Sequence, residues 1–181
     1  MADTLFTPFF SDGIPTTDDD TSSGPMQQYV SFTVGGSEFA VDILAIREFK
    51  RWTETTPLPN TPPYVRGVIN LRGVVVPIYD LRARFGQGAT QPTATHVIMM
   101  VAVSERTVGL LVDAVDDVLT VPQSALSAVP ETDSTASHPF LQAVLTIEER
   151  MIAVLGLERL FSGEVVPPLP LGPSPVSTQS P

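Results

Sequence analysis

The sequence is most informative between residues 67 and 82, where it reads Gly67-Val-Ile-Asn-Leu-Arg-Gly-Val-Val-Val-Pro-Ile-Tyr-Asp-Leu-Arg82. Two apolar runs flank the pair Arg72-Gly73, so this stretch predicts a strand, a tight turn and a second strand. Asp80 follows the second run and is well placed to cap a short helix that continues to Phe85. The unit is therefore a β-hairpin that ends in a helix.

The same pattern recurs 76 residues later in the chain. Residues 67–85 align without a gap with residues 143–161, and both segments end in Leu-x-x-x-Phe. Residues 40–42 also match residues 111–113, at an offset of 71. Each copy then consists of a hairpin, a link, and a hairpin with a closing helix. The alternative is that apolar hairpins resemble one another by chance, but two matches in the same order argue against it.

Further short runs predict the other strands of the body, at residues 29–34, 38–42, 47–52, 96–103 and 107–113. We therefore expect an all-β (mainly β) domain over residues 28–163, made of two packed five-stranded barrels with short helices. The boundary between the barrels is expected within about residues 86–95, and the closing strand and helix near residues 143–161. Packing two such barrels leaves few free strand edges and creates a groove suited to binding.

Both ends of the chain have the composition of tails. Residues 1–27 contain five Asp and no Lys or Arg, which predicts a disordered acidic segment. Phe6, Phe9 and Phe10 lie within it and form either a short docking motif or no functional unit. Residues 164–181 are rich in proline and predict a flexible, extended C-terminal tail.

Composition argues against several classes of function. The formal net charge is −10, so the chain is a poor counter-ion for a phosphate backbone and we expect no nucleic-acid partner. No apolar run approaches the roughly 20 residues of a membrane helix, and we expect no direct membrane insertion. The chain has no cysteine, which excludes disulfides and thiolate metal sites and fits a cytoplasmic protein.

No group of residues in the sequence predicts catalysis, a cofactor or a metal ion. The only histidines, His96 and His138, have no motif around them, and we interpret both as solvent or edge residues. Asp113, Asp116 and Asp117 cluster without the spacing of an EF-hand, and Asp116-Asp117 is interpreted as capping or solvating a turn. We therefore predict that the protein is not an enzyme.

Glu48 and Arg72 are charged residues among apolar neighbours. A charge in that position is costly unless it is paired, so we hypothesise that the two side chains meet at the rim of the first barrel. The pair would fix the geometry of the Arg72-Gly73 turn. The alternative is two unrelated surface charges.

At these residues the sequence resembles the CheW family, the coupling proteins of bacterial chemotaxis-type signalling. The resemblance spans residues 29–161, and the segments that carry it are Tyr29-Val-Ser-Phe-Thr-Val34, Phe39-Ala-Val-Asp-Ile-Leu-Ala-Ile-Arg-Glu48, Pro57-Leu-Pro-Asn-Thr-Pro62, Arg66-Gly-Val-Ile-Asn-Leu-Arg-Gly-Val-Val-Val-Pro77, Tyr79-Asp-Leu-Arg82 and Val108-Gly-Leu-Leu-Val-Asp113. The stretch Gly-Val-Ile-Asn-Leu-Arg-Gly is the most specific of them.

The resemblance implies two SH3-like barrels and a non-catalytic adaptor in two-component signal transduction. Its partners would be the regulatory domain of a CheA-type histidine kinase and the cytoplasmic tip of a methyl-accepting chemoreceptor, so the protein would join membrane receptor arrays through them. Family positions at or near the receptor groove correspond to Ile46, Gly67, Val97 and Gly109. Glu48 and Arg72 correspond to the family's paired charges, which support the partner surfaces.

The last strand and helix differ from the family that the chain resembles. Gly156-Leu157-Glu158 stands where the family often has Asp-Leu, which weakens a helix cap there. The chain is either a chemotaxis adaptor or a CheW-like adaptor of another chemosensory array, such as one for pilus-driven motility. A β-barrel ligand-binding module is the alternative from another class.

Overall fold

The computed structural model describes residues 24–129 and 139–162. The elements in chain order are β1 (Met26–Val34), β2 (Ser37–Asp42), the 3-10 turn η1 (Ile43–Ala45), β3 (Ile46–Arg51), β4 (Val65–Leu71), β5 (Val74–Asp80), α1 (Leu81–Arg84), β6 (Val97–Val103), β7 (Arg106–Val112), β8 (Ala114–Pro122), η2 (Gln123–Ala125), β9 (Leu126–Ser127), β10 (Leu141–Ile147), β11 (Arg150–Leu155) and α2 (Leu157–Phe161). The predicted 164–181 tail, His138 and the three tail phenylalanines lie outside the described residues. The predicted acidic tail ends too late by two residues, because Met26 and Gln27 already belong to β1.

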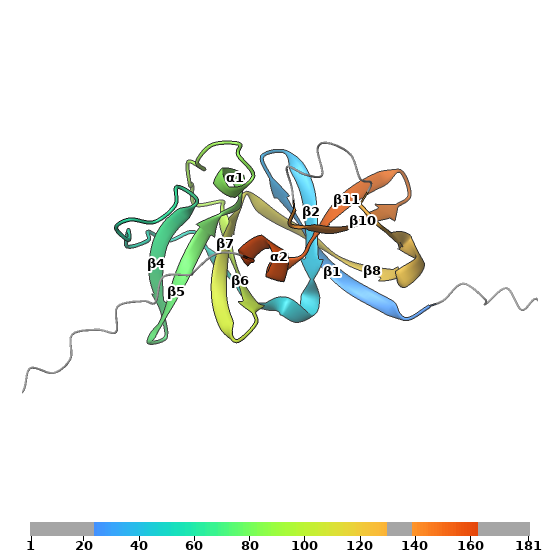
Figure 1. Ribbon diagram of the computed structural model, residues 1–181, viewed down its shortest axis with the longest axis horizontal. Helices are drawn as coiled ribbons and strands as arrows, with labels where there is room; N and C mark the ends of the chain where they lie inside the picture. Colours follow the sequence, from blue (N-terminus) through green and yellow to red (C-terminus); the bar gives the residue numbers. More distant parts are fainter. Residues whose placement is uncertain (1–23, 130–138, 163–181) are drawn as a thin grey trace, which may run out of the picture.

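Two sheets make up the molecule, and the predicted mainly β fold of two SH3-like barrels is confirmed. The first sheet has the strand order β3-β6-β7-β5-β4, and the second has β8-β1-β2-β11-β10-β9. Figure 1 shows β4–β7 on one side and β1, β2, β8, β10 and β11 on the other, with α2 at the junction. The second sheet has a sixth strand, the two-residue β9, where the first has only the bridge between Thr56 and Val68.

The sheets exchange strands between the two halves of the chain. β2 pairs in parallel with β11, and β7 pairs in parallel with β5. The leading hairpin of each half, β1–β2 in the first and β6–β7 in the second, therefore completes the barrel of the other half. The predicted boundary within about residues 86–95 is therefore wrong, since strands on both sides of it share a sheet. Apolar alternation shows which face of a strand is buried but not which strand lies beside it.

The duplication itself is confirmed at the level of strand register. Gly67 pairs with Ile78 across β4 and β5, and Ala143 pairs with Val154 across β10 and β11, which is the same pairing 76 residues later. Both hairpins also carry a β-bulge at their open ends, before Gly67 and before Ala143. The two hairpins are thus equivalent residue by residue.

The leading hairpins are equivalent at an offset of 69 rather than 71. The β1–β2 turn spans residues 34–37, and the β6–β7 turn spans residues 103–106. Both hairpins are antiparallel, and their pairing continues from the turn without a register shift. Ala40 is therefore equivalent to Gly109, not to Leu111, and the match at offset 71 is wrong for this pair of hairpins. A two-residue shift keeps each side chain on the same face, which is why alternation alone did not reveal it.

The helices join the barrels reciprocally. Phe85, which follows α1 of the first half, packs on Phe39 of β2, with ring centroids 4.8 Å apart. Phe161 of α2 packs edge-on against Tyr79 of β5, at 4.7 Å. Both aromatic contacts belong to, or flank, the large apolar core that lies between the sheets. The two barrels are therefore held together by burial of apolar surface.

Candidate partner-binding site

The charged pair expected from the sequence is formed. Arg72 Nη2 donates a hydrogen bond to Glu48 Oε2, so the β4–β5 turn is tied to β3 at the rim of the first barrel. Arg72 and Gly73 have φ values of 51° and 86°, and Asn70 Oδ1 accepts a hydrogen bond of 2.8 Å from the amide of Gly73. Arg72 remains exposed, and an exposed pair adds little stability, so the pair chiefly orders the surface.

Ile46 and Val97 share one face of the first sheet. Ile46 pairs with Val101, and Val97 lies four residues away from Val101 on the same strand, so all three side chains point the same way. Ile46 and Val97 are half-buried against the core between the barrels. Phe49 lies between them on this face and is 49% exposed. The face is therefore an apolar shelf that continues the inter-barrel core to the surface.

Phe49 was missed by the sequence analysis. Its position follows from the register of β3, since it pairs with Met99, two residues from Val97 and from Val101. The β-bulge between Ile46 and Glu48 changes the alternation, so a simple period of two does not predict which face Phe49 occupies.

Gly67 and Gly109 do not line an open surface, because both are buried. Gly67 has a φ of 133°, and a Cβ there would lie 2.2 Å from the carbonyl oxygen of Thr56. At Gly109 a Cβ would lie 2.4 Å from Ile78 Cδ1 and 2.8 Å from Ile98 Cγ2, inside the first barrel. Both glycines are required by the packing of this chain itself.

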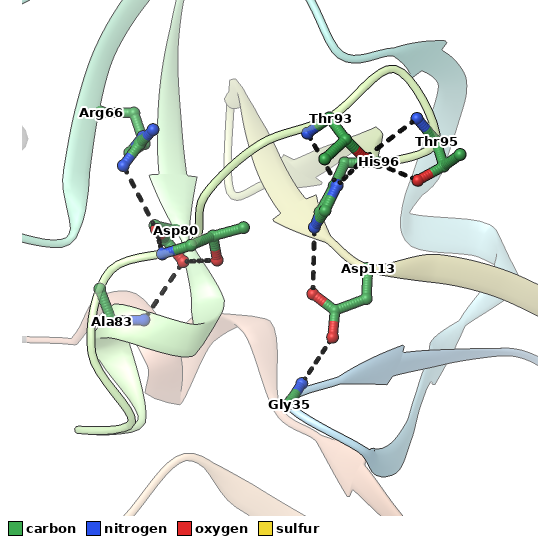
Figure 2. Close-up of polar contacts among 9 residues, drawn as sticks. Gly35, Arg66, Asp80, Ala83, Thr93, Thr95, His96 and Asp113 are labelled. Carbon is green, nitrogen blue, oxygen red and sulfur yellow. Dashed lines mark hydrogen bonds and ion pairs between the residues drawn. The ribbon is translucent and has the colours of Figure 1, made fainter.

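His96 is part of a link between the two sheets. Thr93 donates its amide proton to His96 Nδ1 at 3.0 Å, and His96 Nε2 lies 3.6 Å from Asp113 Oδ1 (Figure 2). Asp113 Oδ2 accepts a 2.7 Å hydrogen bond from the amide of Gly35 in the β1–β2 turn. The His96 side chain is only 15% exposed, so its interpretation as a solvent or edge residue is wrong.

Asp80 caps α1 as expected and also anchors the loop that follows. Its carboxylate accepts hydrogen bonds from the amide of Ala83 at 3.2 Å and from the amide and hydroxyl of Thr90 at 2.8 and 2.7 Å. Arg66 Nη1 lies 3.7 Å from the same carboxylate (Figure 2). Because Asp80 is fully buried, these partners are what make its charge tolerable.

Asp116 and Asp117 lie in β8, a strand that the sequence analysis missed, and not in a turn. β8 is the outer strand of its sheet, where charged side chains on the free edge are common. Within the described residues no group of three or more His, Cys, Asp or Glu side chains could hold a metal ion. The same residues contain no helix long and apolar enough to cross a membrane.

A known protein family matches the part of the chain that forms the two barrels. The family model of the CheW-like domain matches residues 28–165, which include both barrels. The chain belongs to the CheW family.

Several CheW proteins resemble the chain over most of their length. The chemotaxis protein CheW of Rhizobium meliloti is 47% identical over 76% of this chain and 89% of its own. The chemotaxis protein CheW of Klebsiella aerogenes is 36% identical over 76% of this chain and 83% of its own. The crystal structure of the scaffolding protein TtCheW from Thermoanaerobacter tengcongensis has a TM-score of 0.70 and 29% identity, covering 75% of this chain and 92% of that one.

The helix α2 has no side-chain cap, as the glycine at its start predicts. Gly156 stands at its N-cap position and provides no side-chain hydrogen bond there. Glu158, in the first turn, instead accepts hydrogen bonds from the amide and hydroxyl of Ser104 at the β6–β7 turn. The helix of this CheW-family chain is thereby tied to the opposite sheet.

Proposed function

We propose that the protein is a non-catalytic adaptor that couples chemoreceptors to a CheA-type histidine kinase in chemotaxis signalling. The observation that carries this proposal is the CheW family match over both barrels. The structural similarity to the scaffolding protein TtCheW, which covers 92% of that chain, supports it. The protein would act in the cytoplasm and join receptor arrays through its partners.

The receptor side of the proposed adaptor is the apolar shelf of Ile46, Phe49 and Val97. These side chains lie on one face of β3 and β6 beside the core between the barrels. A helix with an apolar stripe can bury such a shelf, which is a recurrent mode of peptide recognition. The receptor partner would be the cytoplasmic tip of a methyl-accepting chemoreceptor. Gly67 and Gly109 contribute to the shape of the first barrel rather than to direct contact with the partner.

The kinase side of the proposed adaptor uses the rim ordered by Glu48 and Arg72. This pair fixes the β4–β5 turn next to the shelf, so a partner on either surface meets a preformed arrangement. Preorganisation of this kind lowers the entropy cost of binding. The partner here would be the regulatory domain of the kinase.

Co-sedimentation with receptor-containing membranes, with and without kinase, tests the proposal. The protein should sediment with the receptors and change kinase activity. The variant Phe49→Ala should sediment about tenfold more weakly, because it removes exposed apolar area from the shelf. Val118→Ala is a matched control, since Val118 is equally exposed on the outer strand of the other barrel. A parent protein that neither joins the membranes nor alters kinase activity would contradict the proposal.

A further inference from the structure

The end of α2 lies against aromatic and basic side chains of the first half of the chain. Phe161, the last residue of α2, packs on Tyr79 at 4.7 Å, and Tyr79 stacks on Tyr64 at 6.5 Å. Arg84 of α1 donates a 3.1 Å hydrogen bond to the carbonyl oxygen of Leu160 and lies over the Tyr64 ring at 4.7 Å. The C-terminal end of α2 is thereby joined to α1 and to the residue that precedes β4.

The surface beside α2, which we name the Tyr64–Arg84 surface, consists of Tyr64, Arg66 and Arg84, all half-buried. The carbonyl oxygen of Tyr64 accepts a 2.7 Å hydrogen bond from the Asp80 amide, and Arg66 Nη1 lies 3.7 Å from the Asp80 carboxylate. Arg66 also lies over the Trp52 ring, at 5.7 Å. These contacts fix the surface before anything docks on it, which lowers the entropy cost of docking.

Positive charge gathers around this surface, although the formal net charge of the chain is −10. Residues 62–85 contain one acidic residue, Asp80, and four arginines, namely Arg66, Arg72, Arg82 and Arg84. Asp80 is fully buried and already accepts three hydrogen bonds. The Arg84 guanidinium has five N–H donors, so it can bind a carboxylate as well as the Leu160 carbonyl.

The chain leaves α2 in an extended conformation. Ser162 has φ −65° and ψ 128°, and its hydroxyl donates a 2.8 Å hydrogen bond to the carbonyl oxygen of Arg159. The sequence continues as Gly163-Glu-Val-Val-Pro-Pro168, and Glu164 is the only charged side chain in residues 163–181. Two residues span at most about 7 Å, so Glu164 stays close to the end of α2.

Residues 165–168 favour an extended backbone. Val165 is β-branched, Val166 precedes a proline, and Pro167-Pro168 favours the polyproline II conformation. A segment with this bias loses less entropy when it docks in extended form. Aromatic side chains are the usual surface on which such proline-containing segments dock.

We propose that residues 163–168, which lie outside the described residues, dock on the Tyr64–Arg84 surface of the same chain. The Glu164 carboxylate binds Arg84, and the prolines pack on the ring of Tyr64. The same chain supplies the segment because only a short loop has to close, which costs little entropy. The docked segment holds α2 against α1 and fixes where the proline-rich tail begins.

A groove of about 570 Å³ beside the β6–β7 turn is the alternative place for this segment, because Ser162 also lines it. Two acidic residues, Glu105 and Glu158, lie in its wall together with a single arginine, Arg106. Glu164 would meet like charges there, and like charges brought together disfavour a contact. The charge of the segment therefore favours the Tyr64–Arg84 surface.

Backbone amide relaxation, measured by NMR on the full-length chain, tests whether the segment is docked. The order parameters of Glu164, Val165 and Val166 should be about 0.8, whereas those of Ser177 and Thr178 should lie below about 0.6. They should not change on tenfold dilution. Values below about 0.6 at all three residues overturn the proposal. Values that fall on dilution overturn it too, because they assign the docked segment to a second copy.

Charge reversal locates the contact. Glu164→Arg alone and Arg84→Glu alone should each lower the order parameters at Val165 and Val166 below about 0.6, because like charges then meet. The double variant Arg84→Glu with Glu164→Arg should recover the parent values, which also shows that Arg84→Glu is folded. Unchanged order in Glu164→Arg overturns the proposal.

Arg106→Glu is the matched control for Arg84→Glu, since it makes the same change of charge in the alternative groove. Its order parameters at Val165 and Val166 should equal those of the parent. Loss of order in Arg106→Glu together with parent order in Arg84→Glu would place the segment in that groove and overturn the proposal.

The prolines supply a second test. Pro167→Ser with Pro168→Ser should lower the order parameters of Val165 and Val166, whereas Pro173→Ser with Pro175→Ser, further along the same tail, should not. Parent order in the first variant overturns the contact with Tyr64. Both variants should co-sediment with receptor membranes as the parent does, because β4 and β3 are opposite edges of the first sheet. Failure of the docking is thereby distinguishable from failure of the adaptor function.

Discussion

Individual glycines in this protein are fixed by contacts within the chain. Gly67 combines a left-handed φ with a carbonyl oxygen where its Cβ would be, and that oxygen belongs to rigid backbone at Thr56. A Cβ at Gly109 would meet side chains rather than backbone, namely Ile78 Cδ1, Ile98 Cγ2 and Met100 Sδ. The first position therefore tolerates a side chain less well than the second.

We expect Gly67→Ala to lower the free energy of unfolding by about 3 kcal/mol, because backbone must move and the φ is strained. Gly73→Ala is the control, since its φ is also positive but no atom lies within 4 Å of the new Cβ. The Gly73→Ala variant should lower the free energy of unfolding by only about 1–2 kcal/mol. Urea denaturation measures both. Equal costs at the two positions would show that the Thr56 carbonyl can move aside.

The pair of Glu48 and Arg72 predicts a coupled effect on function. Arg72→Glu should lower kinase coupling about tenfold by placing like charges together at the rim. Its unfolding free energy should stay within about 1 kcal/mol of the parent, because the pair is exposed. The double variant Glu48→Arg with Arg72→Glu should recover part of the coupling. Strictly additive losses of kinase activation in the double variant would mean that the pair does not act as a unit.

At the scale of elements, α1 and its following loop depend on one buried carboxylate. Asp80→Ala removes the acceptor for Ala83 and for both donors of Thr90, and leaves them unsatisfied in a buried place. We expect a loss of about 2–4 kcal/mol in unfolding free energy. Asp80→Asn keeps one acceptor oxygen, so its unfolding free energy should lie between those of Asp80→Ala and the parent. Chemical denaturation of the three proteins decides the order, and an unperturbed Asp80→Ala would refute the cap.

β8 shows why an element can be missed by sequence analysis. Its adjacent Asp116 and Asp117 suggest a turn, because charged pairs are rare in buried strands. In the structure the strand has one free edge, and Thr33 donates a hydrogen bond of 2.9 Å to Asp116. Only the neighbouring strand β1 explains why this segment is extended.

At the scale of the whole molecule, Asp113 links the sheets through Gly35 and His96. Asp113→Ala should leave the Gly35 amide without its acceptor. We expect faster hydrogen exchange in residues 34–37 and a loss of about 1–2 kcal/mol in unfolding free energy. Asp117→Ala is the control, since that carboxylate accepts from the adjacent amide of Val118 within the same strand. Unchanged exchange in the β1–β2 turn of the Asp113 variant would contradict the link.

The sequence by itself determined the local units of this protein. Alternating apolar residues, the turn at Arg72-Gly73 and the capping Asp80 depend on near neighbours, and all are seen in the structure. The copy at offset 76 was also visible, because a hairpin keeps its register within a few residues of its turn. The meeting of Glu48 and Arg72 followed from the cost of leaving a charge unpaired.

Only the tertiary structure decided which strands lie together. The parallel pairings of β2 with β11 and β7 with β5 join segments far apart in the chain, and parallel pairs need a crossover that no turn residue marks. The hydrogen bond from the Gly35 amide to Asp113 and the crowding of Gly67 by Thr56 likewise join segments that no local pattern pairs. Alternation encodes the buried face of each strand, whereas the neighbour of that strand is set by how the whole core packs.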